Sequence, residues 1–185
     1  MKPSITTKTG DKGQTRLFSG EEVPKYSPRP DCYGDMDELV SILGLARIHC
    51  RHEDASESCL QVQRDLFLVG SEIATTPGKL NRLPRRVDEA FLARMDATRE
   101  ALEEKIPAFR GFTVPGSCPS SAYFDVARAV SRRFERKVAR LFHEGELTNQ
   151  YLLVYVNRLS DFLYLLARYE EDKPVFVNPE QSSEP

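Results

Sequence analysis

The sequence predicts an all-α protein, a single-domain bundle of five helices. Three observations support this fold class. Apolar residues recur with the helical period through most of the chain after about residue 31. The connections between these periodic segments are short, and strand signals are nearly absent. The 185 residues are also enough for one domain with a sizeable core. Helices of about 17–24 residues with short connections favour antiparallel packing in a bundle.

The first two helices are expected near residues 35–51 and 56–74. One apolar stripe marks the first helix, formed by Met36, Leu39, Leu43 and Ala46. The second carries Leu60, Phe67, Gly70 and Ile73 on related faces. It should end at the segment 75–78, because Pro77 and Gly78 both oppose helix continuation.

Three more helices follow, near residues 87–105, 120–143 and 147–170. A polar loop, 77–86, precedes the third helix, which stops before Pro107. A second loop, 107–119, leads into the fourth helix, and Gly145 separates the fourth from the fifth. We therefore predict one domain over residues 1–172. Residues 173–185 form a tail whose polar, proline-containing end should be disordered.

Composition excludes several broad classes of protein. The chain is 40% hydrophobic and 29% charged, as in ordinary globular proteins. Its 26 Lys and Arg against 28 Asp and Glu give a net charge of −2, so no global field attracts nucleic acid or a membrane surface. No run of 18 uncharged apolar residues exists to span a membrane, and no apolar signal core opens the chain. We expect a cytoplasmic protein, in which any basic site is local.

Cysteine usage does not indicate a metal centre. The four cysteines are Cys32, Cys50, Cys59 and Cys118. None has C-x-x-C spacing, and cytoplasmic thiols stay reduced. The histidines near Cys50 and Cys59 match no standard zinc spacing, so structural or surface roles are favoured and no metal ligands are expected.

The N-terminal run 7–15 is the first candidate site. Gly10 and Gly13 allow a tight turn and close backbone approach to a ligand. Threonine hydroxyls, lysine charge and turn N–H groups suit a polyanion. The spacing is not that of a Walker loop. On the run alone, a polar turn with surface lysines remains the favoured interpretation.

The fourth helix carries the second signal, a row of arginines. Arg128, Arg132, Arg136 and Arg140 recur every four residues opposite the core stripe, with Arg133 beside them. Like charges at this spacing destabilise a helix by roughly 0.2–0.5 kcal/mol per pair. Asp125 and Glu135 are expected to relieve only part of the repulsion. The row therefore indicates an anionic ligand or a subunit contact, and a solvated face is the alternative.

Acidic and amide residues on two other helices complete the candidates. Asp35, Asp37 and Glu38 lie in the expected first turn of the first helix, where the macrodipole alone could explain them. The functional alternative is that one of them pairs with an arginine of the fourth helix. On the fifth helix, Asn157 offers donors and an acceptor for a ligand.

Seven separated segments together resemble the PduO-type ATP:cob(I)alamin adenosyltransferases. They are Thr7-Lys8-Thr9-Gly10-Asp11-Lys12-Gly13, Val23-Pro24-Lys25, Gly34-Asp35-Met36-Asp37-Glu38-Leu39 with Gly44, Asp65-Leu66-Phe67 with Gly70-Ser71-Glu72-Ile73-Ala74-Thr75, Phe112-Thr113-Val114-Pro115-Gly116, Arg128 with Arg132-Arg133-Phe134-Glu135-Arg136, and Val156-Asn157-Arg158-Leu159-Ser160-Asp161. The resemblance runs from residue 7 to about residue 168.

The resemblance implies a specific activity and assembly. Members of that family are five-helix bundles that form homotrimers with active sites between adjacent subunits. They bind ATP with Mg²⁺ and transfer its 5′-deoxyadenosyl group to cob(I)alamin, giving adenosylcobalamin and triphosphate. A reductase or an adenosylcobalamin-dependent acceptor enzyme is a possible partner. The cobalamin is itself the nucleophile, so no catalytic base is required of the protein.

The resemblance also implies roles for individual residues. The nucleotide and its phosphates should be bound by Thr7, Lys8, Thr9, Gly10, Thr15, Arg16 and Lys25 from the N-terminal segment, and by Arg132, Arg133, Glu135, Arg136 and Asn157 from the last two helices. Arg132, Asp37 and Phe112 carry the catalytic roles. Asp37 should pair with Arg132, and Phe112 should pack at the lower face of the corrin and help exclude an axial ligand.

Three positions depart from the pattern. The family often has arginine in place of Glu22, asparagine or serine in place of Val40, and glycine in place of Ser117. Glu22 puts negative charge beside the phosphate loop, and serine resists the positive φ that glycine allows. These departures support one alternative, a non-catalytic ATP- or corrinoid-binding delivery or regulatory module. A purely structural trimeric bundle is the third possibility.

Overall fold

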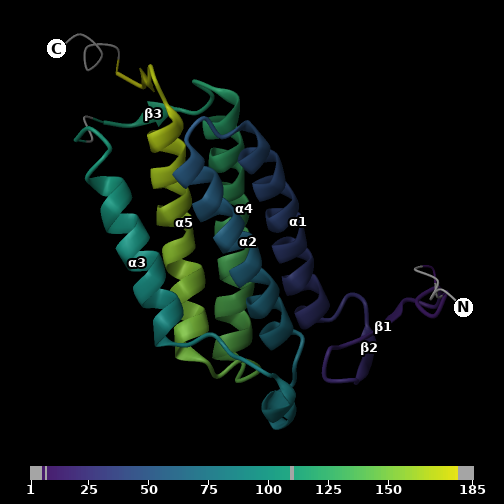
Figure 1. Ribbon diagram of the computed structural model, residues 1–185. Coiled ribbons are helices and arrows are strands. Elements are labelled where there is room, and N and C mark those ends of the chain that lie inside the picture. Colours follow the sequence, from purple (N-terminus) through teal and green to yellow (C-terminus); the bar gives the residue numbers. More distant parts are fainter. Residues whose placement is uncertain (1–5, 7, 109–110, 179–185) are drawn as a thin grey trace, which may run out of the picture.

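Five α-helices form one bundle in the computed structural model, which describes residues 6, 8–108 and 111–178 (Figure 1). The predicted all-α fold is confirmed. The helices are α1 (Pro28–His49), α2 (Glu53–Ile73), α3 (Glu89–Glu103), α4 (Pro119–His143) and α5 (Gln150–Glu170). A 3₁₀ helix, η1 (Pro77–Arg82), lies within the loop expected at 77–86.

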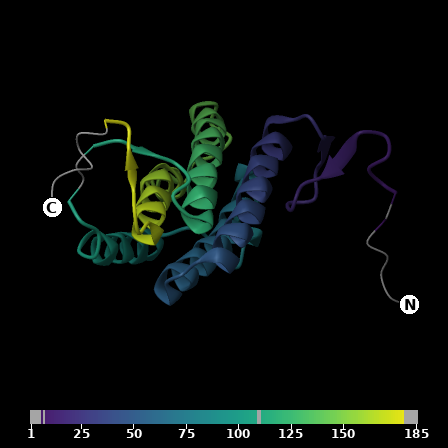
Figure 2. The same ribbon diagram turned by 90° about the horizontal axis from the view of Figure 1, so that it is seen from above.

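The helices pack in a defined order. α1 packs against α2 and α4, α4 packs against α5, and α3 packs against α5. Figure 2 shows α4 between α1 and α5, with α3 at the side of the bundle away from α1. One long face of α4 therefore contacts helices, and the other is left for solvent or a partner.

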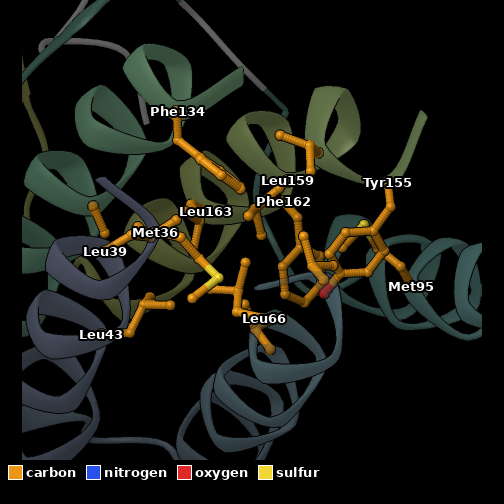
Figure 3. Close-up of a cluster of buried hydrophobic side chains, with 14 of the residues drawn as sticks. Met36, Leu39, Leu43, Leu66, Met95, Phe134, Tyr155, Leu159, Phe162 and Leu163 are labelled. Atoms are coloured by element: carbon orange, nitrogen blue, oxygen red, sulfur yellow. The ribbon is translucent and has the colours of Figure 1, made fainter. Parts of the chain in front are cut away.

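The core lies where the stripes of the helices meet (Figure 3). Leu39 and Leu43 of α1, Leu66 of α2 and Phe134 of α4 are fully buried there. α1 and α2 approach closely at Gly70, because a Cβ built there would lie 2.6 Å from the sulfur of Met36. A larger residue at this position would force the end of the Met36 side chain to move.

A buried polar contact joins α2, α3 and α5. The hydroxyl of Tyr155, on α5, donates to Asp65 Oδ2 over 3.2 Å. Arg94 of α3 donates to both oxygens of the same carboxylate at 2.8 Å. Burial raises the pKa of Tyr155 well above its ordinary value, so the hydroxyl stays a donor. Asp65 is thus paired and hydrogen-bonded, as a buried carboxylate must be.

The predicted start of the first helix is wrong by about two turns. α1 begins at Pro28 rather than near Asp35. Pro28 and Pro30 occupy its first turn, where the missing N–H has no helical acceptor to lose. The prolines therefore open the helix instead of delaying it.

The sequence predicted almost no strands, and the structure has two short antiparallel strand pairs. β1 (Gln14–Arg16) pairs antiparallel with β2 (Glu22–Pro24), and β3 (Thr113–Val114) pairs with β4 (Val175–Phe176). β4 lies in the tail expected at 173–185, so the first part of that tail is ordered. The expected disorder of the tail's end falls mostly on residues 179–185, outside the described residues. No helix among the described residues has the length and apolarity needed to cross a bilayer.

Candidate functional site

The N-terminal loop is a compact turn with one strained residue. Lys8 has φ of 60°, a left-handed conformation uncommon for a residue with a Cβ. Its carbonyl accepts from Asp11 N over 3.4 Å, and Gly13 N donates to Gly10 O over 3.1 Å. Such strain persists where the surroundings fix it, and it concentrates at ligand sites. The uncommon conformation of Lys8 therefore makes this loop a candidate ligand site.

Lys25 lies against this loop, although it comes twelve positions after Gly13 in the sequence. Lys25 N donates to Gly13 O over 2.9 Å. A Cβ built on Gly10 would lie 2.9 Å from Lys25 Nζ, so only glycine lets the ammonium group lie there undisturbed. The structure thus brings together two of the predicted phosphate-binding elements. Thr9 is exposed, and Thr7 lies outside the described residues.

Thr15 and Arg16 lie on β1, facing β2 in the hairpin. Thr15 is opposite Val23, and Arg16 is opposite Glu22. The negative charge of Glu22, one of the departures from the family pattern, is therefore the cross-strand neighbour of a predicted phosphate-binding arginine. Opposite charges at such positions attract each other. The Glu22 carboxylate therefore competes with an anionic ligand for the Arg16 guanidinium.

The hairpin is attached to the bundle through Glu21. Glu21 Oε1 lies 2.8 Å from Lys79 Nζ and accepts from Thr76 Oγ1 over 2.9 Å. The hydrogen bond from Lys79, followed by that from Ser19, lowers the pKa of Glu21 from 4.5 to about 2. The carboxylate is therefore ionised at neutral pH and anchors the hairpin to η1.

The arginine row of α4 is paired at its two ends. Arg128 Nε lies 3.4 Å from Asp125 Oδ1, and Arg140 Nε lies 2.8 Å from Glu144 Oε1. Both pairs are local, at i,i+3 and i,i+4 spacing. The ends of the row are thus partly neutralised by the helix itself.

The middle of the row is not neutralised. Within the described part of the chain, Arg132 and Arg136 form no ion pair; their one polar contact beyond the helix backbone ladder runs from Arg136 Nη1 to Arg132 O, at 3.0 Å. Both side chains are exposed. Glu135 accepts from Asn157 Nδ2 over 2.8 Å, across α4 and α5. Four predicted site residues therefore lie together, and two of them are cations without an acidic partner.

The acidic residues of α1 do pair with α4, although through a different arginine. Arg133 Nε lies 3.0 Å from Asp35 Oδ2, and a second nitrogen of Arg133 contacts Glu38. Asp37 and Arg132 are both exposed and are not paired within one chain. Helix geometry explains this, because Asp37 points roughly away from Asp35 on α1.

Sequence reasoning missed Lys137 and the role of Asp31. Lys137 Nζ lies 2.8 Å from Asp31 Oδ1 and 3.0 Å from Asp35 Oδ1. The spacing of Asp31, Asp35 and Glu38 by four and three residues places them on one helix face. That spacing could have predicted an acidic face on the first helix, but Asp31 lay outside the helix as it was expected, near residues 35–51.

Phe112 is presented to solvent by an ordered backbone. It is 84% exposed. Its carbonyl accepts from Val177 N over 2.9 Å, next to the β3–β4 pair. The positive φ values in the described part of this loop fall on Gly111, at 156°, and Gly116, at 107°, so Ser117 does not carry a strained conformation. Val114 and Val175 of the same strand pair and Val177 directly after it are exposed as well, and a group of exposed apolar side chains of this kind is typical of a binding surface.

The N-terminal loop and the face of α4 are different parts of one chain. In both views β1 and β2 lie beyond the end of α1, on the side away from α5, and the loop extends further out (Figures 1 and 2). α4 lies on the other side of α1. Within one chain, the hairpin lies close to the C-terminal end of α4, where Leu17 and Val23 line one pocket with Leu141.

Comparison with protein families and curated proteins identifies relatives along most of the chain. A family model described as "Cobalamin adenosyltransferase" matches residues 5–170. A corrinoid adenosyltransferase of Citrobacter freundii is 34% identical over 170 residues, which is 92% of this chain and 96% of that protein. The PduO corrinoid adenosyltransferase of Salmonella typhimurium is 33% identical over 91% of this chain. There the chain spans about half the relative's length, 50%.

Solved structures agree with the sequence relatives. One is a variant of a PduO-type ATP:corrinoid adenosyltransferase from Lactobacillus reuteri, complexed with cobalamin and ATP. It is 32% identical with a TM-score of 0.78, and the match covers 90% of each chain. A second variant of an adenosyltransferase from the same organism, complexed with ATP, has 30% identity and a TM-score of 0.84 over 95% of this chain and 100% of that one.

Proposed function

The chain belongs to the cobalamin adenosyltransferase family, and we propose that it transfers the 5′-deoxyadenosyl group of ATP to cob(I)alamin, releasing triphosphate. In this reaction a bond forms between cobalt and the ribose 5′-carbon, and the bond from that carbon to the triphosphate oxygen breaks. The electron pair of the broken bond leaves with the triphosphate. The protein must align the reactants and stabilise the charge of the leaving group.

The observation that carries this proposal is the pair of unneutralised guanidinium groups of Arg132 and Arg136. A helix tolerates adjacent cations when an anion faces them. The polyphosphate of ATP is such an anion, and arginine binds phosphate oxygens through two parallel N–H bonds. Asn157 and Glu135, joined by their hydrogen bond, flank the two cations and provide polar groups for the rest of the nucleotide.

The second half of the nucleotide site is proposed to come from a neighbouring subunit. The N-terminal loop, Lys25 and the hairpin residues Thr15 and Arg16 form one group, and the face of α4 forms another. In a homotrimer, the loop of one subunit can cover the ATP bound to α4 of the next. The exposed side chains of Asp37 and Arg132 would then be free to pair between subunits, which fits their lack of pairing within one chain.

Phe112 is proposed to contact the lower face of the corrin. An apolar ring at that face offers the cobalt no ligand atom. It favours a four-coordinate cobalt, which is easier to reduce to the nucleophilic state. The exposure of the ring and the hydrogen bond at its carbonyl support this role.

Magnesium is proposed to enter with ATP. The described residues hold no group of three or more His, Cys, Asp or Glu side chains that could bind a metal ion. Mg²⁺ commonly binds nucleotide phosphates and keeps several of its waters. We therefore assign no protein residue as a magnesium ligand. We also propose a cytoplasmic location and a transient contact with a reductase or an acceptor enzyme.

An anaerobic absorbance assay tests the proposed function. Purified protein is mixed with chemically reduced cob(I)alamin, ATP and Mg²⁺, and loss of cob(I)alamin with formation of adenosylcobalamin is followed. We expect turnover by the unchanged chain. Arg132→Met should lower kcat/KM by roughly 10²–10³-fold, the effect of losing one preorganised charge-stabilising group.

Arg140→Met is the matched control, because it removes a guanidinium from the same row that is already paired with Glu144. Its kcat/KM should stay within about threefold of the unchanged chain, as expected for an exposed ion pair. Full activity of Arg132→Met, or equal losses in the two variants, would contradict the role of the central pair.

One alternative rests on a specific observation. Glu22 lies opposite Arg16 and reduces the positive charge around the loop. This favours a delivery or regulatory module that binds ATP or corrinoid without catalysis. ATP binding without formation of a cobalt–carbon bond in the same assay would select it.

A further inference from the structure

The strand pair that carries Phe112 is too short to be stable by itself. β3 and β4 contain two residues each, Thr113–Val114 and Val175–Phe176. An isolated two-stranded ribbon is marginal in water even when it is longer. Something outside the ribbon must therefore fix the backbone beside Phe112.

Arg168, in the last turn of α5, provides that attachment. Its side chain is only 5% exposed. One terminal nitrogen donates to Thr113 Oγ1. The other donates to Asp125 Oδ2 of α4 over 2.6 Å and lies 2.9 Å from Glu171 Oε1. One guanidinium thus connects β3 to the ends of two core helices.

We propose that Arg168 is a positioning residue that holds Phe112 in its exposed, corrin-facing orientation by fixing Thr113. The inference rests on the proposed function, which gives Phe112 its role. Side chains alternate along a strand, so with Thr113 turned toward Arg168, Phe112 must point to the opposite side. The exposure agrees, because Thr113 is half-buried and Phe112 and Val114 are exposed.

The chemistry of the contact indicates positioning rather than stability alone. Within the described residues, Arg168 Nε is buried without a hydrogen-bond partner. A buried ion pair is weak evidence for stability, because well-packed apolar residues in place of both partners are often as stable. The planar guanidinium does, however, fix the orientation of the groups that it binds, because its N–H donors point in fixed directions like a rigid fork. Here one arm of the fork is bonded to the strand that carries Phe112.

Thr113→Val tests the proposal, because it removes the acceptor hydroxyl and keeps the β-branched shape. Thr98→Val is the matched control, since among the described residues Thr98 Oγ1 bonds only to a carbonyl of its own helix, Arg94 O. The first measurement is amide hydrogen exchange on the protein without substrates. We expect exchange at least fivefold faster in peptides that contain β3 and β4 in Thr113→Val, and unchanged exchange there in Thr98→Val.

The second measurement separates positioning from a structural role. For Thr113→Val we expect kcat to fall about five- to twentyfold, while KM for ATP stays within about twofold and Tm within a few degrees. The fraction of bound cob(II)alamin that is four-coordinate, read from its absorption and electron paramagnetic resonance spectra, should fall in parallel. Arg168→Lys, which keeps the charge and loses the fork, should show the same pattern.

Two results would overturn the proposal: unchanged exchange in β3 and β4, or faster exchange with kcat and the four-coordinate fraction unchanged. Failure of the proposed function is distinguishable. If the unchanged chain shows no turnover, the adenosyltransferase assignment fails, and the exchange measurement still decides whether Arg168 fixes the strand.

Discussion

Asn157 and Glu135 are joined across two helices by a hydrogen bond of 2.8 Å, with Asn157 Nδ2 as donor. The bond orients the Glu135 carboxylate toward α5. Glu135 lies three residues after Arg132 on α4. At that spacing the carboxylate could reach the Arg132 guanidinium and neutralise it. The amide thereby keeps positive charge available for a ligand.

Asn157→Leu should therefore weaken ATP binding indirectly as well as directly. Without the amide, Glu135 can turn toward Arg132 and compete with the phosphates. We expect KM for ATP to rise about tenfold, equivalent to about 1.4 kcal/mol, with little change in Tm because residue 157 is exposed. Steady-state kinetics at saturating cobalamin measure this. Asn81→Leu, at an exposed amide on η1, is the control and should leave KM unaltered.

The double variant Glu135→Gln with Asn157→Leu distinguishes the two contributions. If Glu135 competes once it is released, removing its charge should restore part of the lost affinity. A double variant as weak as Asn157→Leu alone would show that the amide acts only by direct contact.

Gly10→Ala should disturb Lys25 without unfolding the bundle. The new Cβ would lie 2.9 Å from Lys25 Nζ and 3.1 Å from Cε, so the lysine side chain must move. We expect ATP affinity to fall about five- to tenfold, equivalent to roughly 1–1.4 kcal/mol, measured by calorimetric titration. Gly78→Ala is the matched control, because a Cβ there meets nothing within 4 Å. Equal affinities in the two variants would argue against Lys25 as a phosphate ligand.

The sequence predicted the helices better than their ends, for physical reasons. Stripes such as Met36, Leu39 and Leu43 define a helix because burial follows the helical period. Pro28 and Pro30 carry no such period, so the early start of α1 was invisible. Two- and three-residue strands are too short to leave an alternation, and β4 pairs with a strand about 60 residues away in the sequence.

The sequence predicted the residues of the site, but not which acidic residue pairs with which arginine. The arginine row and the glycine turn are local patterns. Which arginine stays unpaired depends on α1, because the partners of Arg133 are Asp35 and Glu38, about a hundred residues earlier. Glu135 was expected to relieve part of the repulsion in the row, and instead it accepts a hydrogen bond from Asn157. Periodicity on one helix cannot show which neighbour faces it.

Glu22→Gln should strengthen ATP binding. The carboxylate lies opposite Arg16 in the hairpin register. Removing an exposed negative charge near the ligand should raise affinity about two- to fivefold, the scale of an exposed charge interaction. The gain should shrink at high salt, where such charges are screened. Titrations at two salt concentrations measure it, with Glu104→Gln at an exposed position after α3 as control. If ATP affinity did not rise at low salt, the charge of Glu22 would not weaken nucleotide binding.

Acid should release the hairpin from the bundle through Glu21. Its pKa is lowered from 4.5 to about 2, chiefly by the hydrogen bond from Lys79. A carboxyl group with a lowered folded-state pKa contributes stability above its unfolded pKa and loses it as pH falls toward the folded value. The Tm difference between the unchanged chain and Glu21→Gln should therefore be constant from neutral pH down to about 4.5 and should shrink between 4.5 and about 2. Glu57→Gln, at an exposed position of α2, is the control and should show no such window. A Tm difference that vanished well above pH 4.5, or that persisted unchanged to pH 2, would mean that the ionised Glu21 is not the anchor.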